Sequence, residues 1–349
     1  MNLFEIASKF PEKQNAYDFF ENYRWPQNVE CAFCNGSKIS KRGQNLRYHC
    51  KECRKYFSVI TNTQLHNTRM PLQKWLMAFA IVTDAKKGVS AMQLKRNIGV
   101  TYKVAWAMGH KIRELMSFET RSQEELDGLV EMDETFIGGK PRKPNAPNGI
   151  PIGTQKYLNN KLKLLKEAKV PLKRGKGNPA KPDLNIKRGR GSQKKIPVVG
   201  IVKRDGNVVA QVMEKLTAKN LKAMVKKHVD TEDAVIITDS YKGYSKLHTI
   251  IEHIKIDHKI AFSYRGINTN TIESFWAIIE RGIIGQYHQV SPKYLPNYVV
   301  EFVFKFNNRK EDDMFETLVR HSMYHREYAG NGGFEEPKKQ KNKKSKVSF

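Results

Sequence analysis

Four cysteines, arranged as two C-x-x-C pairs, constrain the first sixty residues of this 349-residue chain more tightly than any other feature. The pairs are Cys31 with Cys34 and Cys50 with Cys53, and fifteen residues separate them. Two tight turns at this spacing can offer four thiolates to one tetrahedral Zn²⁺, and a full sulfur shell indicates a structural ion. The alternatives are unrelated reduced thiols or two redox motifs. We predict one structural zinc in a ribbon over residues 1–62, whose small sheet needs the metal to fold.

The charge of the chain indicates a polyanionic partner. Its 62 Lys and Arg residues outnumber 35 Asp and Glu, for a net charge of +27. Nucleic acid and an anionic membrane surface both fit such a charge. The sequence has no apolar run of about 18 residues and no basic-then-apolar secretory pattern at its start. We therefore expect an intracellular protein that acts on nucleic acid.

Two segments concentrate this charge. Residues 140–195 contain seventeen Lys and Arg against two acids, with seven Pro and six Gly. This composition predicts a flexible basic insert, in which only residues 161–169 could form a short helix. The second segment is a basic tail over residues 326–349, which we also expect to be flexible.

Residues 63–126 have the pattern of a helical region. Pro71 opens a helix with apolar residues at helical spacing, and Ser90 caps a short helix that Gly99 ends. This short helix and the one that follows match a helix-turn-helix. The alternative is a helical linker with a solvated basic face. The second helix would expose Tyr102, Lys103, Trp106, His110 and Arg113, and Lys103, Trp106 and Arg113 are the predicted DNA contacts.

Acidic residues inside apolar segments mark the remaining region. Asp133 lies in the strand-like segment LVEMDETFI, where Asp is disfavoured. A hairpin with its turn at residues 205–207, a helix, a buried strand ending at Asp239 and a helix carrying Glu273 follow. This order is that of a ribonuclease-H-like (RNase H-like) sheet. We predict an α/β protein with an RNase H-like catalytic domain over residues 127–325, preceded by the ribbon and the helix-turn-helix.

These three carboxylates suggest metal chemistry. Converging Asp133, Asp239 and Glu273 side chains could hold two Mg²⁺ ions about 3.5–4 Å apart for in-line phosphoryl transfer. Each acid also has a structural explanation. Asp133 could be solvated at a strand edge, Asp239 could cap the turn with Ser240, and Glu273 could close a capping box on Asn270.

The motifs together resemble a known family. The segments CAFC, CKEC, YKVAWAMGHKIRELM, MDETFIGGK, TDSYKGY and NTNTIESFWAIIERGIIGQYHQVS, within residues 15–325, are similar to those of IS1595-family (ISXO2-like) insertion-sequence transposases. These are DDE-type enzymes with an N-terminal zinc ribbon. The resemblance implies metal-dependent DNA cutting and joining on an RNase H-like fold. By motif match, it implies that Asp133 and Asp239 are ligands of two catalytic Mg²⁺ or Mn²⁺ ions.

The third ligand is predicted to be Glu273. Members of the family vary here, so Asn270 and Glu280 are alternatives. The position seven residues after Glu273 is commonly basic in the family, whereas this chain has Glu280 followed by Arg281. His288 also matches the family pattern, and its predicted role is to contact a DNA strand or to support a metal ligand, with a packing role as the alternative.

The resemblance predicts a DNA transposase that binds terminal inverted repeats and catalyses metal-dependent strand cleavage and strand transfer. The expected partners are double-stranded DNA at the element ends and the target, with no membrane partner. Synapsis of two ends implies a homo-oligomer, at least a dimer. We expect it at the nucleoid or in the cytoplasm of a prokaryotic host. The predicted phosphate contacts are Lys140, Arg281, Lys305 and Arg309.

Two other functions are compatible with the same features. One is a non-catalytic DNA-binding protein, either a decayed transposase or a regulator. The other is an RNase H-like nuclease or resolvase that performs no strand transfer.

Overall fold

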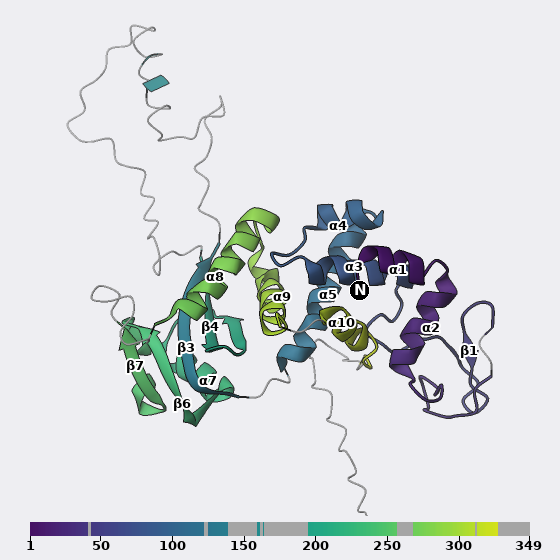
Figure 1. Ribbon diagram of the computed structural model, residues 1–349, viewed down its shortest axis with the longest axis horizontal. Coiled ribbons are helices and arrows are strands. Elements are labelled where there is room, and N and C mark those ends of the chain that lie inside the picture. Colours follow the sequence, from purple (N-terminus) through teal and green to yellow (C-terminus); the bar gives the residue numbers. More distant parts are fainter. Residues whose placement is uncertain are drawn as a thin grey trace, which may run out of the picture. The chain divides into compact units, whose positions relative to one another are not determined.

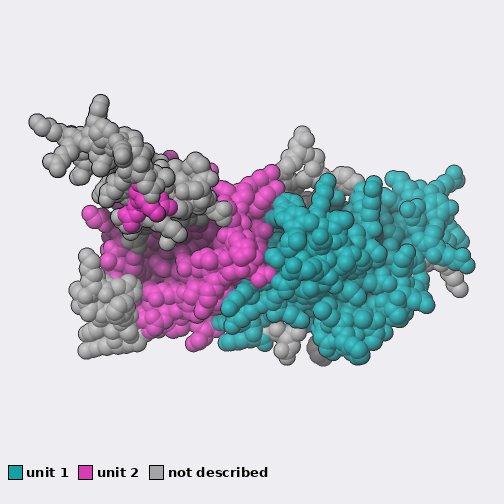
Figure 2. Space-filling view, turned by 90° about the horizontal axis from the view of Figure 1, so that it is seen from above, with its two compact units in different colours: residues 1–121, 308–349 teal, residues 122–307 magenta. Residues whose placement is uncertain are grey.

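The chain divides into two compact units, coloured separately in Figure 2. In the computed structural model, Met1–Arg121 and Asn308–Phe349 form the first unit, and Ser122–Asn307 form the second. The structure describes residues 1–40, 43–121, 125–138, 159–160, 163, 195–256, 268–310 and 313–326. Nearly all of the predicted basic insert and tail, including Lys140, lies outside these described residues. The segment after residue 307 belongs to the first unit, whereas the catalytic region was predicted to extend to residue 325.

Helices make up most of the first unit. They are α1 (Leu3–Lys9), α2 (Lys13–Arg24), α3 (Leu72–Asp84), α4 (Ala91–Ile98), α5 (Tyr102–Arg121) and α10 (Met314–Ser322). The central helix is α3, which is buried around most of its circumference and contacts each of the others. Although α10 comes late in the sequence, it joins this bundle, and His321 Nδ1 donates to the Leu115 carbonyl at 3.0 Å. Within the described residues, no helix combines the length and apolarity needed to cross a membrane.

The predicted boundaries of α4 are confirmed. The backbone N–H of Gln93 donates to Ser90 Oγ at 3.2 Å, which caps the start of the helix. Gly99 ends it with φ 62°, in the left-handed region that glycine adopts without a steric penalty. Only Val100 and Thr101 then precede α5, so the two helices pack as a pair joined by a short turn.

The exposed face of α5 is narrower than predicted. Lys103 is exposed. The ring of Trp106 is half-buried, and its centroid lies 4.2 Å from that of the His110 ring. Arg113, in contrast, is only 5% exposed, so its predicted place on the exposed face is wrong. A Cβ at Gly109 would lie 3.3 Å from an Arg113 nitrogen, which shows that the guanidinium folds back over this glycine.

The second unit is built on a mixed sheet with helices on both faces (Figure 1). The strands are β3 (Leu126–Ile137), β4 (Ile196–Lys203), β5 (Val208–Val212), β6 (Val229–Asp239) and β7 (Glu252–Ile256). Their spatial order is β5-β4-β3-β6-β7, with β3 central. The first three strands are antiparallel neighbours, whereas β6 and β7 run parallel to β3. This order and these directions are those of the predicted RNase H-like sheet.

Different helices cover the two faces of the sheet. One face packs against α7 (Ala218–His228) and the short helices η2 (Lys242–Tyr244) and η3 (Leu247–Thr249). The other packs against α8 (Asn270–Gly282), the π-helical turn η4 (Ile283–Tyr287) and α9 (Leu295–Asn307), which follows the short helix η5 (Pro292–Tyr294). The first face receives Val130 and Met132 of β3. Side chains alternate along a strand, so Glu131, which lies between them, must face α8.

A glycine in β4 allows α8 to approach the sheet closely. A Cβ added to Gly200 would lie 2.8 Å from the Trp276 ring and 2.9 Å from Ile272, both on α8. Gly200 is paired with Asp133 on the central strand, so this close approach occurs beside a predicted catalytic residue.

We expect Gly200→Ala to lower the free energy of unfolding by about 1–3 kcal/mol, because the large Trp276 ring would have to shift. Denaturant unfolding of the two variants Gly200→Ala and Gly285→Ala measures the effect. Gly285 is the matched control, since a Cβ there meets nothing within 4 Å. Equal stability of the two variants would show that α8 does not depend on this contact.

Candidate active site

Three polar side chains of β3 lie in a row beneath α8. They are Glu131, Asp133 and Thr135, which alternate with residues that face the opposite side of the sheet. Glu131 and Thr135 are buried, and Asp133 is partly buried. A central strand rarely carries such a row, because each buried polar group needs a partner.

Asp239 lies beside Asp133. It is the last residue of β6, which runs parallel to β3. Met132 is paired with Thr238, so the next residues along the two strands, Asp133 and Asp239, lie side by side. One carboxylate oxygen of Asp239 accepts the Tyr241 backbone N–H at 2.9 Å. The turn-capping alternative for Asp239 is thus observed, and it uses only one of the two oxygens.

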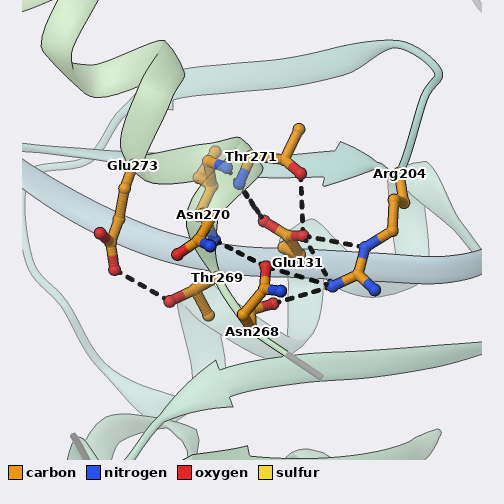
Figure 3. Close-up of polar contacts among 8 residues, drawn as sticks. Glu131, Arg204, Asn268, Thr269, Asn270, Thr271 and Glu273 are labelled. Atoms are coloured by element: carbon orange, nitrogen blue, oxygen red, sulfur yellow. Dashed lines mark hydrogen bonds and ion pairs between the residues drawn. The ribbon is translucent and has the colours of Figure 1, made fainter. Parts of the chain in front are cut away.

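Glu273 lies in the first turn of α8, where it is exposed (Figure 3). Its Oε1 accepts the Thr269 hydroxyl at 3.0 Å. Thr269 is also the N-cap residue of α8, so the capping box on Asn270 that we considered from the sequence does not form. Asn270 is the exposed first residue of the helix, and its N–H donates to Asn268 Oδ1 at 3.1 Å.

The electrostatic environment of Asp133 includes the other two predicted catalytic acids. Burial and then the negative charge of Glu134 raise the pKa of Asp133 to about 7, and the charges of Asp239 and Glu273 add to the shift. The Glu134 backbone N–H opposes it in part. Negative charges raise a neighbouring carboxyl pKa only when they are close, so the three predicted catalytic acids share one electrostatic environment. Such a perturbed group is typical of functional sites.

Glu134 points to the opposite side of β3 and is held by Tyr244. The Tyr244 hydroxyl donates to Glu134 Oε2, and both side chains are buried. Burial and the charge of Glu134 raise the pKa of Tyr244 well above its usual value, so the phenol stays a donor. Because Tyr244 follows Asp239 closely in the sequence, this bond ties the segments that carry the two aspartates. No local sequence pattern indicates this bond.

Glu280 is also bound to β3. Its Oε1 accepts the Thr135 hydroxyl at 2.9 Å, seven residues after Glu273 on α8. The neighbouring Arg281 is exposed, and its Nε donates to the Ala277 carbonyl at 2.8 Å. His288 is exposed with φ 59°, and its Nδ1 lies 3.1 Å from the Ile284 carbonyl.

One predicted phosphate contact is wrong. Lys305 is 7% exposed, and its Nζ lies 2.6 Å from Oε1 of the fully buried Glu301. The Tyr287 hydroxyl donates to the same carboxylate. Reaching a phosphate would break this ion pair and leave Glu301 buried without its cation, which is costly. Arg309, the other predicted phosphate contact near this helix, is exposed.

The four cysteines form a metal-ligand cluster. All four sulfur atoms lie within 4.8 Å of one another, with 3.5 Å between Cys31 and Cys53 and 3.7 Å between Cys34 and Cys50. These separations exceed a disulfide length of about 2.05 Å. They agree with the edge of a tetrahedron, roughly 3.8 Å, that a Zn–S bond of about 2.3 Å requires. The donor set therefore fits Zn²⁺.

The sheet around this cluster is minimal. Strands β1 (Tyr48–His49) and β2 (Tyr56–Phe57) pair antiparallel, and the buried core consists of Cys31, Cys50 and Phe57. The half-buried rings of Trp25 and Tyr48 pack against Phe57. So small a core agrees with a fold that depends on its metal.

The carboxylates are less tightly gathered than the cysteines. Among the described residues, the cysteines are the one group of three or more possible ligands within 4.8 Å of each other. The three acids nevertheless fit divalent cations by their chemistry. Their oxygens are hard ligands, and a nearby cation would counteract the burial and the neighbouring acids that raise the pKa of Asp133.

Comparison with known proteins relates both regions to transposases. A model of the transposase zinc-ribbon domain matches residues 11–56, and a model of the ISXO2-like transposase domain matches residues 155–307. Asp239 and Glu273 lie within the second match, and Asp133 precedes it. An uncharacterized protein in transposable element ISH50 of Halobacterium salinarum is 26% identical over 162 residues, 44% of this chain. The chain spans about half of that relative, since the match covers 53% of its length.

Solved structures of Mos1 assemblies are also similar. The Mos1 strand transfer complex has a TM-score of 0.26 at 10% identity, covering 71% of this chain and 78% of that one. The Mos1 mariner paired-end complex with Mn has a TM-score of 0.25 at 11% identity, covering 71% and 78%. Scores this low do not establish a common fold, so the fold assignment rests on the strand order. Because the two family models match 46 and 153 of the 349 residues, more than half together, the chain belongs to the IS1595 (ISXO2-like) transposases.

Proposed function

We propose that this chain binds the terminal inverted repeats of an insertion sequence and catalyses metal-dependent DNA strand cleavage and strand transfer. The reacting site consists of Asp133, Asp239 and Glu273. The observation that carries this proposal is geometric: Asp133 of β3 lies beside Asp239 at the end of β6, and α8, which carries Glu273, packs over the same face of the sheet. Burial, the charge of Glu134 and the two other acids also raise the pKa of Asp133, and a divalent cation at the site would counteract this shift.

Each acid has a distinct position relative to the proposed metals. Asp133 and Asp239 come from adjacent strands and would hold two Mg²⁺ or Mn²⁺ ions between them, with Glu273 of α8 completing the set. Such ions supply Lewis-acid stabilisation of the charge that develops on the reacting phosphate. One oxygen of Asp239 also caps the following turn, which fixes the carboxylate at the end of β6. Asn270 and Glu280 stay alternatives for the third ligand.

DNA binding is assigned to the first unit. The zinc ribbon and the α4–α5 pair would hold the element ends, with exposed Lys103 on α5 among the contacts. The exposed Arg281 and Arg309 remain candidates for phosphate contacts, as does Lys140 of the insert. Bringing two ends together requires at least a dimer. Action on DNA places the protein inside the cell, at the nucleoid of a prokaryotic host.

A non-catalytic DNA-binding protein is the main alternative, and a nuclease without strand transfer is another. Burying Asp133 among other acids destabilises the fold, and a protein that only bound DNA would gain nothing from it. Strand transfer from precut ends separates a transposase from a simple nuclease, because the nuclease joins nothing.

Asp133→Asn and Asp239→Asn are each expected to lower DNA strand cleavage at least about 100-fold, because each removes a metal ligand worth several kcal/mol in the transition state. Binding to the element ends should persist, since these residues do not belong to the first unit. Cleavage of end-labelled DNA in Mg²⁺ measures the effect, with Glu252→Gln, an exposed residue of β7, as control. Wild-type cleavage by Asp239→Asn would refute the assignment.

The stability of the metal-free protein should depend on pH through Asp133. Its pKa rises from 3.8 to about 7 on folding, so the folded state binds more protons between these values. The free energy of unfolding therefore falls as pH rises through this window, by on the order of a few kcal/mol. Denaturant unfolding from pH 4.5 to 7.5 in EDTA measures the slope.

Asp133→Asn should flatten this slope, because the amide does not titrate. Adding Mg²⁺ at pH 7.5 should stabilise the wild type more than the variant. Equal slopes for the two proteins would show that Asp133 is not the titrating group.

Metal analysis is expected to find one zinc per chain, held by the cysteine cluster. Cys50→Ser, at a fully buried ligand, should lose this zinc and the hydrogen-exchange protection of residues 25–57. Binding to the element ends should fall at the same time. The sheet of the second unit serves as the internal control and should keep its protection. Unchanged protection in the zinc-free protein would refute a structural role for the metal.

A further inference from the structure

Glu131 is a fully buried carboxylate that the proposed reaction does not use. It lies two residues before Asp133 on the same face of β3, and its exposed fraction is 0%. A buried carboxylate is costly unless cations and hydrogen-bond donors surround it. An apolar side chain could fill the same space, so the contacts of Glu131 indicate what its charge is for.

These contacts hold the first turn of α8. Oε2 of Glu131 accepts the backbone N–H of Thr271 at 2.9 Å (Figure 3). The same oxygen accepts the backbone N–H of Ile272 at 3.0 Å. Oε1 accepts the Thr271 hydroxyl at 2.9 Å. The first N–H groups of a helix have no partner within it, and the helix dipole makes this end partly positive. The N-cap residue Thr269 makes no side-chain cap, so a residue of the central strand supplies one.

Arg204 completes the arrangement. Its guanidinium pairs with Glu131 Oε1 at 3.1 Å and donates to the Asn268 carbonyl at 3.0 Å (Figure 3). The Arg204 backbone N–H donates to Leu129 of β3. The segment that enters α8 is therefore fixed to the sheet both through Glu131 and through its cation.

A second attachment lies further along the helix. Thr135 donates to Glu280, so α8 is bound to β3 at Glu131 and at Thr135, on either side of Asp133. Glu273 lies in the first turn, one residue beyond the two N–H groups that Glu131 holds. Any movement of this turn away from β3 would change the separation between the Glu273 and Asp133 carboxylates.

We propose that Glu131 is a positioning residue, which fixes Glu273 relative to Asp133 by capping α8 from the central strand. This role rests on the proposed function of the site. Glu131 would touch neither metal nor DNA, because all its described contacts are with α8 and Arg204. Residues that orient a metal ligand without binding the metal act in the same way. Their loss typically lowers metal affinity or activity about 10–100-fold.

Glu131→Gln tests the proposal, because it keeps the shape of the side chain and removes the charge. We expect DNA binding to be unchanged, the Mg²⁺ concentration for half-maximal cleavage to rise about tenfold or more, and cleavage to recover in part at high Mg²⁺. Hydrogen exchange of the peptide 268–280 should be faster than in the wild type, because Thr271 and Ile272 lose a charged acceptor.

Two controls separate positioning from general destabilisation. Asp127→Asn is the matched control, since Asp127 also lies on β3 and pairs with a cation, Lys203, but is exposed and away from α8. Val225→Ala truncates the core on the opposite face of the sheet and lowers stability without touching α8. Both should keep the Mg²⁺ dependence of the wild type.

An unchanged Mg²⁺ dependence in Glu131→Gln, or the same shift in Val225→Ala, overturns the positioning role while leaving the proposed function intact. Failure of the wild type to cleave DNA with any divalent metal overturns both. In that case, faster hydrogen exchange of the peptide 268–280 in Glu131→Gln would show only that Glu131 caps α8.

Discussion

Burial of carboxylates on the central strand is the constraint on which the rest of the second unit depends. Strand β3 carries three acids close together, at Glu131, Asp133 and Glu134. The pKa of Asp133 is raised further by the charges of Asp239 and Glu273. Each acid needs its own compensation. Glu131 has a helix N-terminus and Arg204, and Glu134 has the Tyr244 hydroxyl. Asp133 is left with a raised pKa, and this imbalance makes the site a candidate for divalent metals.

The same compensation builds the site. The bond from Tyr244 ties the segment after Asp239 to β3, and the bonds from Glu131 tie the start of α8 to the same strand. Gly200 allows α8 to lie close above. The contacts that stabilise the acids are therefore also the contacts that bring three distant segments together. In the ribbon, by contrast, the four-cysteine cluster lies where a larger core would be, because the ribbon buries little more than Cys31, Cys50 and Phe57.

Most of the sheet and the helix ends could be predicted because their signals are local. Ser90 and Gly99 bound α4 within a few residues, and alternation and turn residues predict the hairpin. Burial of charged side chains was harder to predict. Arg113 and Lys305 looked like surface cations, but one folds over a glycine and the other pairs with a buried glutamate. A basic residue on a helix has the same local pattern in either case.

The sequence alone determined the ligand types, the four-cysteine spacing and the order of strands and helices, because these depend on residues near one another in the chain. The tertiary structure decided which acids are compensated and by what. Glu131 and Thr271 are 140 residues apart, and Thr135 and Glu280 are 145 apart. No local pattern records such pairs, since they form only when the sheet brings α8 over β3. The position of Glu273 relative to Asp133, on which the proposed chemistry depends, is a property of that packing.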